Sequence, residues 1–364
     1  MPDRALRYVR QVTLPGFGRD GQRRLDGARV LVIGAGGLGS AVLPSLAAAG
    51  VGVLGIVDDD VVEVTNLHRQ LLHGPADVGR PKVESARSTL TALGAARVET
   101  HDARFTAETA DAFLADYDLV VDGSDNYETR YLTNDVAARA GIPLVWGAVS
   151  QYAGHVGVVL PGDPDYRDLF PAPPDPAGVL TCEIGGVLPT VVAVIGATMA
   201  TETIKVLTGI GTPLSGRITT YDALTARFRE IPFTHDPERD RPSPAAPPTS
   251  EEDTMTDTSD SRELDVRELQ DLVEDGRPVQ LIDVREPWEA EIAAIDGSRL
   301  IPLGTLSEAA AGIDPSVPVV AYCHHGMRSQ QAVEILRAAG VPARSLVGGI
   351  DAWSRIADPS VARY

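Results

Sequence analysis

Apolar and polar positions along residues 28–233 alternate in a way that predicts buried strands separated by helices. Residues 28–34 (ARVLVIG) form a continuous apolar run, as in strands buried on both faces of a sheet. Residues 37–50 (GLGSAVLPSLAAAG) then have helical spacing and end on a glycine. Further strands are expected at 52–58, 118–125, 142–150 and 155–160, a helix with proline at its first position at 81–93, and an antiparallel hairpin at 216–223 and 226–233. This is the α/β pattern of a Rossmann-like, doubly wound sheet.

The pattern is interrupted over residues 234–262, where Pro, Ser, Thr and acidic residues replace apolar ones. Such a segment has little to bury and predicts a flexible acidic linker with a relaxed reach of about 30 Å. A second α/β unit follows, with strands expected at 279–284 and 317–323 and helices at 261–276 and 329–340. We therefore predict one domain over 1–233, the linker over 234–262 and a smaller domain over 263–364.

Composition narrows the class of protein. The formal net charge is −19, which disfavours a nucleic-acid partner because such proteins carry basic surfaces. The longest apolar stretch, residues 187–200, is too short to cross a membrane and predicts a buried helix. Two cysteines cannot form a disulfide framework, and the N-terminus has no apolar signal core. We expect a soluble cytoplasmic protein with no membrane partner.

A glycine-rich turn lies between the first strand and the first helix. Residues 34–39 read GAGGLG, so that Gly34, Gly36 and Gly39 have the G-x-G-x-x-G spacing. This spacing lets a phosphate approach the N-terminus of a helix. Asp58 ends the next strand, where an acidic side chain binds ribose hydroxyls. The motif alone supports NAD and ATP equally.

The polar residues that follow favour ATP. A hydride-transfer site does not need a dense polar set, whereas arginine and lysine neutralise a triphosphate and a departing pyrophosphate. The candidates are Asp60, Asn66, Arg69, Gln70 and Lys82. Asp125, followed by Asn126, comes after the third strand, where a carboxylate suits Mg2+ bound to phosphate oxygens. Taken singly, Arg69 and Lys82 are equally consistent with solvated surface charges.

These motifs resemble the MoeB/ThiF family of ubiquitin-activating-enzyme-like adenylyltransferases over about residues 4–232. The resemblance rests on GAGGLG, DDDVVEVTNLHRQ, GRPKVESA, DGSDN and the opening RYVRQ. It implies that ATP adenylates the C-terminal glycine of a small ubiquitin-like sulfur carrier ending in Gly-Gly. It also implies that Gly37 lies near the phosphates, that Asp58 binds the ribose and that Asp125 holds Mg2+.

The resemblance further implies that Asn66, Arg69 and Lys82 contact the phosphates. Arg10, in RYVRQ, would reach the ATP of a neighbouring subunit, which implies a homodimer. The chemistry needs little acid or base catalysis, because the carrier carboxylate is already ionised when it attacks the α-phosphate. Arg10, Arg69, Lys82 and Mg2+ would align the reactants and offset their charge.

Residues 165–174 (DYRDLFPAPP) depart from the family. Many members have cysteines at the positions of Asp165 and Asp168 and a second pair near the end of the domain, and the four bind zinc. This chain has none of them, so we expect no zinc site and expect packing and prolines to hold the stretch. The resemblance places Cys182 near the adenylate. It either forms a covalent link with the carrier or only packs, as most free cysteines do.

Residues 323–329 (CHHGMRS) join a predicted strand to a predicted helix. Loop N–H groups, a helix N-terminus and Arg328 together stabilise an anion, so we expect Cys323 to be a thiolate that can carry a persulfide. The spacing of Cys323 and Arg328 is one residue shorter than in cysteine phosphatases and favours a sulfurtransferase. With DVREPWE, IPL and GGIDAW, residues 263–357 resemble rhodanese domains, in which Asp283 would brace the loop. We expect His324 and His325 to be exposed rather than metal ligands.

The two halves together predict adenylation followed by sulfur transfer. The Cys323 persulfide would attack the adenylate, release AMP and leave an acyl-disulfide, from which Cys182 or an external thiol would free the carrier thiocarboxylate. The sulfur donor remains open between thiosulfate and a cysteine desulfurase. The alternatives are adenylation alone with sulfur from another protein, an NAD-dependent oxidoreductase, and a non-enzymatic scaffold that binds a carrier.

Overall fold

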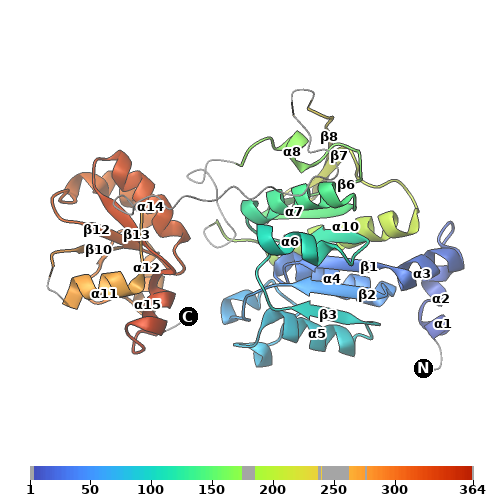
Figure 1. The fold of residues 1–364 in the computed structure, drawn as a ribbon, viewed down its shortest axis with the longest axis horizontal. Coiled ribbons are helices and arrows are strands. Elements are labelled where there is room, and N and C mark those ends of the chain that lie inside the picture. Colours follow the sequence, from blue (N-terminus) through green and yellow to red (C-terminus); the bar gives the residue numbers. More distant parts are fainter. Residues whose placement is uncertain (1–3, 174–184, 237–238, 240–261, 275–276, 363–364) are drawn as a thin grey trace. The chain divides into compact units, whose positions relative to one another are not determined.

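The computed structural model describes residues 4–173, 185–236, 239, 262–274 and 277–362 (Figure 1). These residues form two compact units, each with its own sheet and core. Cys182 and most of the expected linker lie outside the described residues.

The first unit is built on an eight-stranded sheet in the order β3-β2-β1-β4-β5-β6-β7-β8 (Figure 1). Its strands are β1 (Arg29–Ile33), β2 (Val53–Val57), β3 (Val98–His101), β4 (Leu119–Asp122), β5 (Leu144–Ser150), β6 (Ala153–Val159), β7 (Arg217–Asp222) and β8 (Arg227–Pro232). The first five pair in parallel, and β5 to β8 pair antiparallel. The expected Rossmann-like sheet and the late hairpin are therefore confirmed, while β3 was not anticipated.

Helices cover both faces of this sheet (Figure 1). The helices of this unit in the described residues are α1 (Arg4–Arg7), α2 (Val9–Val12), α3 (Gly18–Gly27), α4 (Gly37–Ala49), α5 (Lys82–Ala92), α6 (Ala107–Leu114), α7 (Tyr127–Ala140), α8 (Tyr166–Leu169) and α10 (Pro189–Thr208), with short 3-10 turns η1 (Val64–Asn66) and η2 (Pro75–Asp77). Successive residues of β1 belong to opposite cores: Val30 and Val32 to one, Leu31 and Ile33 to the other. This explains the unbroken apolar run. Pro81 is the N-cap of α5 rather than its first residue.

Helix α10 is the apolar stretch that the sequence assigned to a buried helix. The expectation that this stretch is too short to cross a membrane is wrong, because the helix continues to Thr208 and is long and apolar enough by length and composition alone. Its residues Val191, Val192, Ile195 and Met199 nevertheless belong to the core cluster shared with α4. A Cβ at Gly196 would lie 2.4 Å from that of Ala41, so this glycine allows the two helices to approach closely.

The second unit has a five-stranded parallel sheet in the order β11-β10-β12-β13-β9. Its strands are β9 (Glu263–Leu264), β10 (Gln280–Asp283), β11 (Arg299–Leu300), β12 (Val319–Tyr322) and β13 (Ala343–Leu346). Its helices are α11 (Val266–Glu274), α12 (Pro287–Ile292), α13 (Leu306–Ala309), α14 (Met327–Ala338) and α15 (Gly349–Ile356), with 3-10 turns η4 (Leu303–Thr305) and η5 (Ala310–Gly312).

The beginning of this unit differs from the expectation of one helix over 261–276. Glu263 and Leu264 form the edge strand β9, which pairs with β13. The Oδ1 atom of Asp265 accepts a hydrogen bond from the Glu268 N–H at 2.8 Å, so Asp265 caps a helix that begins at Val266. The cap separates strand from helix where apolar periodicity alone does not.

Candidate active sites

Three loops meet at the carboxyl edge of the first sheet. Strand β1 lies between β2 and β4, and Ile33 pairs in parallel with both Val57 and Asp122. The glycine turn, Asp58 and the DGSDN segment therefore leave the sheet side by side. The strand order reverses between β1 and β4, and ligands of such sheets bind at this switch point.

The glycine turn requires glycine at defined positions. Gly34 has φ +88, and a Cβ at Gly39 would lie 2.0 Å from the Gly34 oxygen. A Cβ at Gly37 would lie 3.1 Å from the Val192 side chain. Gly36 is the N-cap of α4, whose first N–H groups have no partner within the helix. The turn thus brings bare backbone donors to the switch point, as phosphate binding requires.

Asp58 is fixed against this turn by two backbone donors. Its Oδ2 atom accepts from the Ala35 N–H at 2.7 Å and its Oδ1 atom from the Asp60 N–H at 2.9 Å. Burial raises the pKa of Asp58 to about 6, although Lys82 and the backbone donors act in the opposite direction. The carboxyl group is therefore held rigidly where a ribose is expected.

Lys82 lies among carboxylates at the start of α5. Its side chain is 8% exposed, and its Nζ atom lies 2.7 Å from the Oδ2 atom of Asp60. Burial disfavours its charge, but Asp58, Asp60 and Asp125 outweigh burial and raise the pKa of Lys82. The Asp60 side chain is 65% exposed, so a phosphate can replace it as the partner of this cation.

Arg69 and Gln70 lie beside the glycine turn. The Nη1 atom of Arg69 donates to the Thr65 carbonyl at 2.9 Å, and its Cγ atom would be 4.0 Å from a Cβ at Gly37. The Gln70 Nε2 atom would be 3.7 Å from a Cβ at Gly36. Gln70 is buried, and its Oε1 atom finds no hydrogen-bond partner among the described residues. Both side chains are therefore close enough to serve a nucleotide.

Asn66 and Asn126 shape turns within the same region. The Oδ1 atom of Asn66 accepts from the Glu63 N–H at 3.1 Å and caps η1. The Oδ1 atom of Asn126 accepts from the Thr129 N–H at 2.8 Å and begins α7. The structure thus shows a local role for each, and their contact with a nucleotide stays a prediction.

Buried polar groups that sequence reasoning missed lie next to Asp125. The Oδ1 atom of Asp122 accepts from the Ser124 N–H at 2.9 Å, and burial raises the pKa of Asp122. Its Oδ2 atom has no hydrogen-bond partner among the described residues. Arg130 is buried and donates through Nη2 to the Ser124 carbonyl at 3.0 Å. The only feature of the sequence that could have identified Asp122 is its position at the end of a buried strand. No feature of the sequence pointed to Arg130.

Asp122 and Asp125 are the carboxylates that could hold the expected Mg2+. Asp125 is exposed, and the buried Asp122 carries an unused oxygen three positions earlier. No group of three His, Cys, Asp or Glu side chains among the described residues can hold a metal ion by itself. Mg2+ is commonly held by one or two carboxylates together with substrate phosphates, and the residues present fit that arrangement.

Arg10 is exposed on α2, and the structure of a single chain shows no functional contact for its side chain among the described residues. Its reach into a neighbouring subunit stays a prediction. The proposed covalent role of Cys182 falls outside the described residues.

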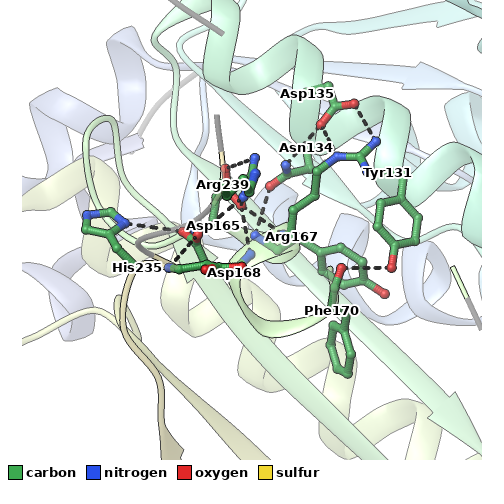
Figure 2. Close-up of polar contacts among 11 residues, drawn as sticks. Tyr131, Asn134, Asp135, Asp165, Arg167, Asp168, Phe170, His235 and Arg239 are labelled. Atoms are coloured by element: carbon green, nitrogen blue, oxygen red, sulfur yellow. Dashed lines mark hydrogen bonds and ion pairs between the residues drawn. The ribbon is translucent and has the colours of Figure 1, made fainter. Parts of the chain in front are cut away.

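Asp165 and Asp168 occupy a network of ion pairs (Figure 2). The Nη2 atom of Arg239 donates to the Oδ2 atom of Asp165 at 2.9 Å, and its Nη1 atom pairs with the other oxygen of Asp165. The same Nη1 atom lies 3.4 Å from the Oδ1 atom of Asp168. The Nδ1 atom of His235 is 3.2 Å from the Oδ2 atom of Asp168. The Arg239 cation therefore contacts both carboxylates at the positions where relatives were expected to use zinc.

This network corrects two expectations. Packing and prolines do not act alone on residues 165–174, because Asp165 also caps α8 by accepting from the Arg167 N–H at 2.8 Å. His235 and Arg239 lie inside the segment expected to be a free linker from residue 234, yet both contact the first unit. The polar composition of this segment predicted a flexible linker, yet its polar side chains His235 and Arg239 attach its beginning to the first unit.

The CHHGMRS loop encloses the thiol of Cys323. Cys323 is 2% exposed, and its Sγ atom accepts from the Gly326 N–H at 3.1 Å. Gly326 has φ +106 and begins α14. A Cβ at Gly349 would lie 2.3 Å from the Cys323 carbonyl oxygen, which explains the glycine in GGIDAW. A backbone donor and a helix N-terminus thus approach the sulfur as expected.

Arg328 is held by a partner that the sequence did not reveal. It donates to both oxygens of Glu289 on α12, at 2.6 Å each. Burial acts to raise the pKa of Glu289, but Arg328 outweighs burial and lowers it. The positive charge of Arg328 is therefore paired with the Glu289 carboxylate. That Arg328 stabilises an anion on the Cys323 sulfur stays a prediction.

Asp283 contacts the residue before the loop, and His324 and His325 belong to the loop itself. Asp283 is fully buried and accepts from the Tyr322 hydroxyl at 3.1 Å, so it braces the residue before Cys323. The rings of His324 and His325 stack with centroids 4.0 Å apart. Both are half-buried rather than exposed as expected, and burial lowers the pKa of His324 to about 4. Burial therefore favours the neutral form of His324, which stacks on His325 within the loop.

Comparison with known proteins places both units in families. The sequence profile of the ThiF family matches residues 8–242, and that of the Rhodanese-like domain matches residues 265–356. The chain is 42% identical to the probable adenylyltransferase/sulfurtransferase MoeZ of Mycobacterium tuberculosis, covering 100% of this chain and 96% of that protein. It is 39% identical to adenylyltransferase and sulfurtransferase MOCS3-2 of Zea mays, covering 100% and 81%.

Two further relatives match the first unit. The sulfur carrier protein adenylyltransferase of Thermus thermophilus is 51% identical, with 64% of this chain and 88% of that protein covered. Among solved structures, Escherichia coli MccB with ATP superposes with a TM-score of 0.58 at 20% identity, covering 66% of this chain and 74% of that one. At that identity the superposition shows the fold alone.

Proposed function

Because this chain belongs to the ThiF family and also carries a rhodanese-like domain, we propose that it activates a sulfur carrier and then sulfurates it. The carrier is a small ubiquitin-like protein ending in Gly-Gly. ATP adenylates its C-terminal glycine, and sulfur then passes from a persulfide on Cys323 to give a thiocarboxylate.

One observation carries the proposal: Lys82, Asp58 and the glycine turn converge at the switch point of the sheet. A charged lysine among carboxylates beside bare N–H groups suits a triphosphate better than a nicotinamide. An NAD-dependent oxidoreductase would leave the buried thiol of Cys323 and its enclosing loop without a role. The full-length relatives in Mycobacterium tuberculosis and Zea mays carry both activities in their names.

In the adenylation step the chain mainly positions charges. The carrier carboxylate attacks the α-phosphorus atom, the bond to the bridging oxygen breaks, and pyrophosphate leaves with the electron pair. Asp58 would hold the ribose, while Lys82 and Arg69 would move from Asp60 and Thr65 to phosphate oxygens. Asp125, with Asp122 behind it, would hold Mg2+, which offsets phosphate charge.

In the transfer step the terminal sulfur of the Cys323 persulfide attacks the acyl carbon of the adenylate. AMP leaves, and an acyl-disulfide joins the carrier to Cys323. A second thiol, from Cys182 or from an added reductant, then attacks the Cys323 sulfur, is oxidised to a disulfide with it and releases the carrier thiocarboxylate. The Gly326 N–H would stabilise negative charge on sulfur throughout.

The remaining partners are also part of the proposal. The persulfide would come from thiosulfate or from a cysteine desulfurase. Arg10 would complete the ATP site of a second copy of the chain in a cytoplasmic homodimer. The net charge of −19 gives no basis for binding nucleic acid.

Incubation with ATP, Mg2+, thiosulfate and a purified carrier ending in Gly-Gly tests this function directly. Intact-mass analysis of the carrier should show one oxygen replaced by sulfur. A carrier adenylate without sulfur would support the first unit and count against Cys323 or the donor. Carriers that remain unchanged across a panel would refute carrier activation.

A further inference from the structure

His73 joins the glycine turn to helix α5 from the buried side. It is 5% exposed, and its Nε2 atom lies 3.0 Å from the carbonyl oxygen of Ala35. Its Nδ1 atom lies 2.8 Å from the hydroxyl of Ser85. Because a carbonyl oxygen only accepts, Nε2 must carry the hydrogen, and in the neutral ring Nδ1 then accepts from Ser85.

The ring is neutral in these surroundings. Burial lowers the pKa of His73, and the nearby charge of Lys82 acts in the same direction, while the bond to Ala35 and the charge of Asp77 oppose both. Ser85 is fully buried on α5, one turn after Lys82. The tautomer is therefore set by the two groups that the ring connects.

This contact determines where the next N–H group points. The peptide between Ala35 and Gly36 is planar and trans, so its C=O and N–H point in opposite directions. His73 holds the C=O on the buried side, which turns the Gly36 N–H the other way. The Ala35 N–H is held in turn by Asp58 at 2.7 Å. Both neighbouring peptides of a turn with little intrinsic stiffness are thus locked by side chains.

We propose that His73 is a positioning residue for nucleotide binding, which fixes the glycine turn and ties it to the helix that carries Lys82. The proposal rests on the ATP-dependent function proposed above. The phosphate donors proposed here belong to two separate parts of the chain. The N–H groups of the glycine turn precede α4, whereas the Lys82 ammonium belongs to α5. The Ala35–His73–Ser85 chain of hydrogen bonds keeps them in register.

The test compares His73→Leu, His73→Gln and Ser85→Ala with a matched control. The control is Thr89→Val, because the Thr89 hydroxyl donates to the Leu72 carbonyl at 2.9 Å and so also links α5 to this segment without touching the turn. In the full-length protein, calorimetry gives the Kd for ATP, and ATP–pyrophosphate exchange gives separate KM values for ATP and carrier.

His73→Leu should raise the Kd and KM for ATP about tenfold, the scale of one lost hydrogen bond and a stranded carbonyl. The KM for carrier should stay unchanged. His73→Gln keeps a donor at the Nε2 position and should recover most of the affinity, and Ser85→Ala should have an intermediate effect.

Equal ATP affinities in wild type and His73→Leu, or the same loss in Thr89→Val, would overturn the proposal. If His73→Leu does not fold, wild-type ATP affinity in Ser85→Ala would also overturn it, because the Ser85 hydroxyl is the group that ties the ring to α5. A wild-type protein that binds no ATP would instead refute the proposed function, which separates the two failures.

Discussion

Replacing Arg239 with alanine removes a cation from between two carboxylates that depend on it (Figure 2). The side chains of Arg239 and Asp165 are only 15% and 12% exposed, and that of Asp168 is fully buried. Exposed ion pairs contribute about 0–1 kcal/mol, and removing one partner of a buried pair costs about 3–5 kcal/mol. For a bidentate pair at this degree of burial we expect a local loss of about 2–3 kcal/mol.

The assay should be local, because unfolding of a two-unit chain does not give one free energy. Hydrogen exchange followed by mass spectrometry reads residues 163–170 and 233–239 separately. A loss of about 2–3 kcal/mol corresponds to exchange about 30 to 150 times faster in both segments. The control Arg23→Ala breaks a pair with Asp20 whose side chains are each 76% exposed, and it should leave exchange nearly unchanged.

The pH dependence has a definite sign. Burial acts to raise the pKa of Asp165, but Arg239 and backbone N–H groups outweigh burial, so the net shift is downward. A depressed pKa contributes stability above the unfolded value of about 3.9, and this stability is lost as pH falls through the folded value. The difference between wild type and Arg239→Ala should therefore be full at pH 7 and shrink below about pH 4.

Two results would refute this reasoning. Exchange that increases only in residues 233–239 would show that Arg239 does not hold the 163–170 segment. Faster exchange of wild type after addition of a zinc chelator would show that a metal, not the arginine, forms the cross-link.

Three further predictions concern the two candidate sites. Cys323→Ser should abolish carrier thiocarboxylate, measured by intact mass, and spare ATP–pyrophosphate exchange; loss of both would contradict the division of labour. Lys82→Ala should slow ATP–pyrophosphate exchange about 100-fold, as for a lost transition-state donor, while Asp60→Ala should change that rate about threefold or less. Equal losses in the two variants would mean that the Lys82–Asp60 ion pair, rather than Lys82 alone, supports adenylation. ATP affinity should fall as pH drops through about 6, because burial raises the pKa of Asp58 and the acid is then protonated. Asp58→Asn should flatten that profile, whereas an unchanged slope would assign the titration to another group. The raised pKa also means that the contribution of Asp58 to folding stability is fully present below about pH 3.9 and is lost as pH rises through 6.

Features that depend on residues close together in the sequence could be predicted from the sequence. The strands around the glycine turn were visible as unbroken apolar runs, because both faces of β1 are buried. Gly34 and Gly39 were recognisable because a positive φ and a 2.0 Å approach within one turn admit no other residue. Asp58 followed from its place at the end of β2, where the course of the chain alone brings it to the turn.

The partners of these residues were decided by tertiary structure. His73 meets Ala35 38 positions away, Glu289 meets Arg328 39 positions away, and Arg239 meets Asp165 74 positions away. No periodicity relates such pairs, because their distances are set by the order of strands in the sheet and by the packing of helices on it. The sequence by itself determined two α/β units, a glycine-rich turn at the end of β1 and a loop that holds a cysteine between a strand and a helix. The tertiary structure alone decided which charges surround them, since a buried polar group takes whichever partner the fold brings within hydrogen-bonding distance.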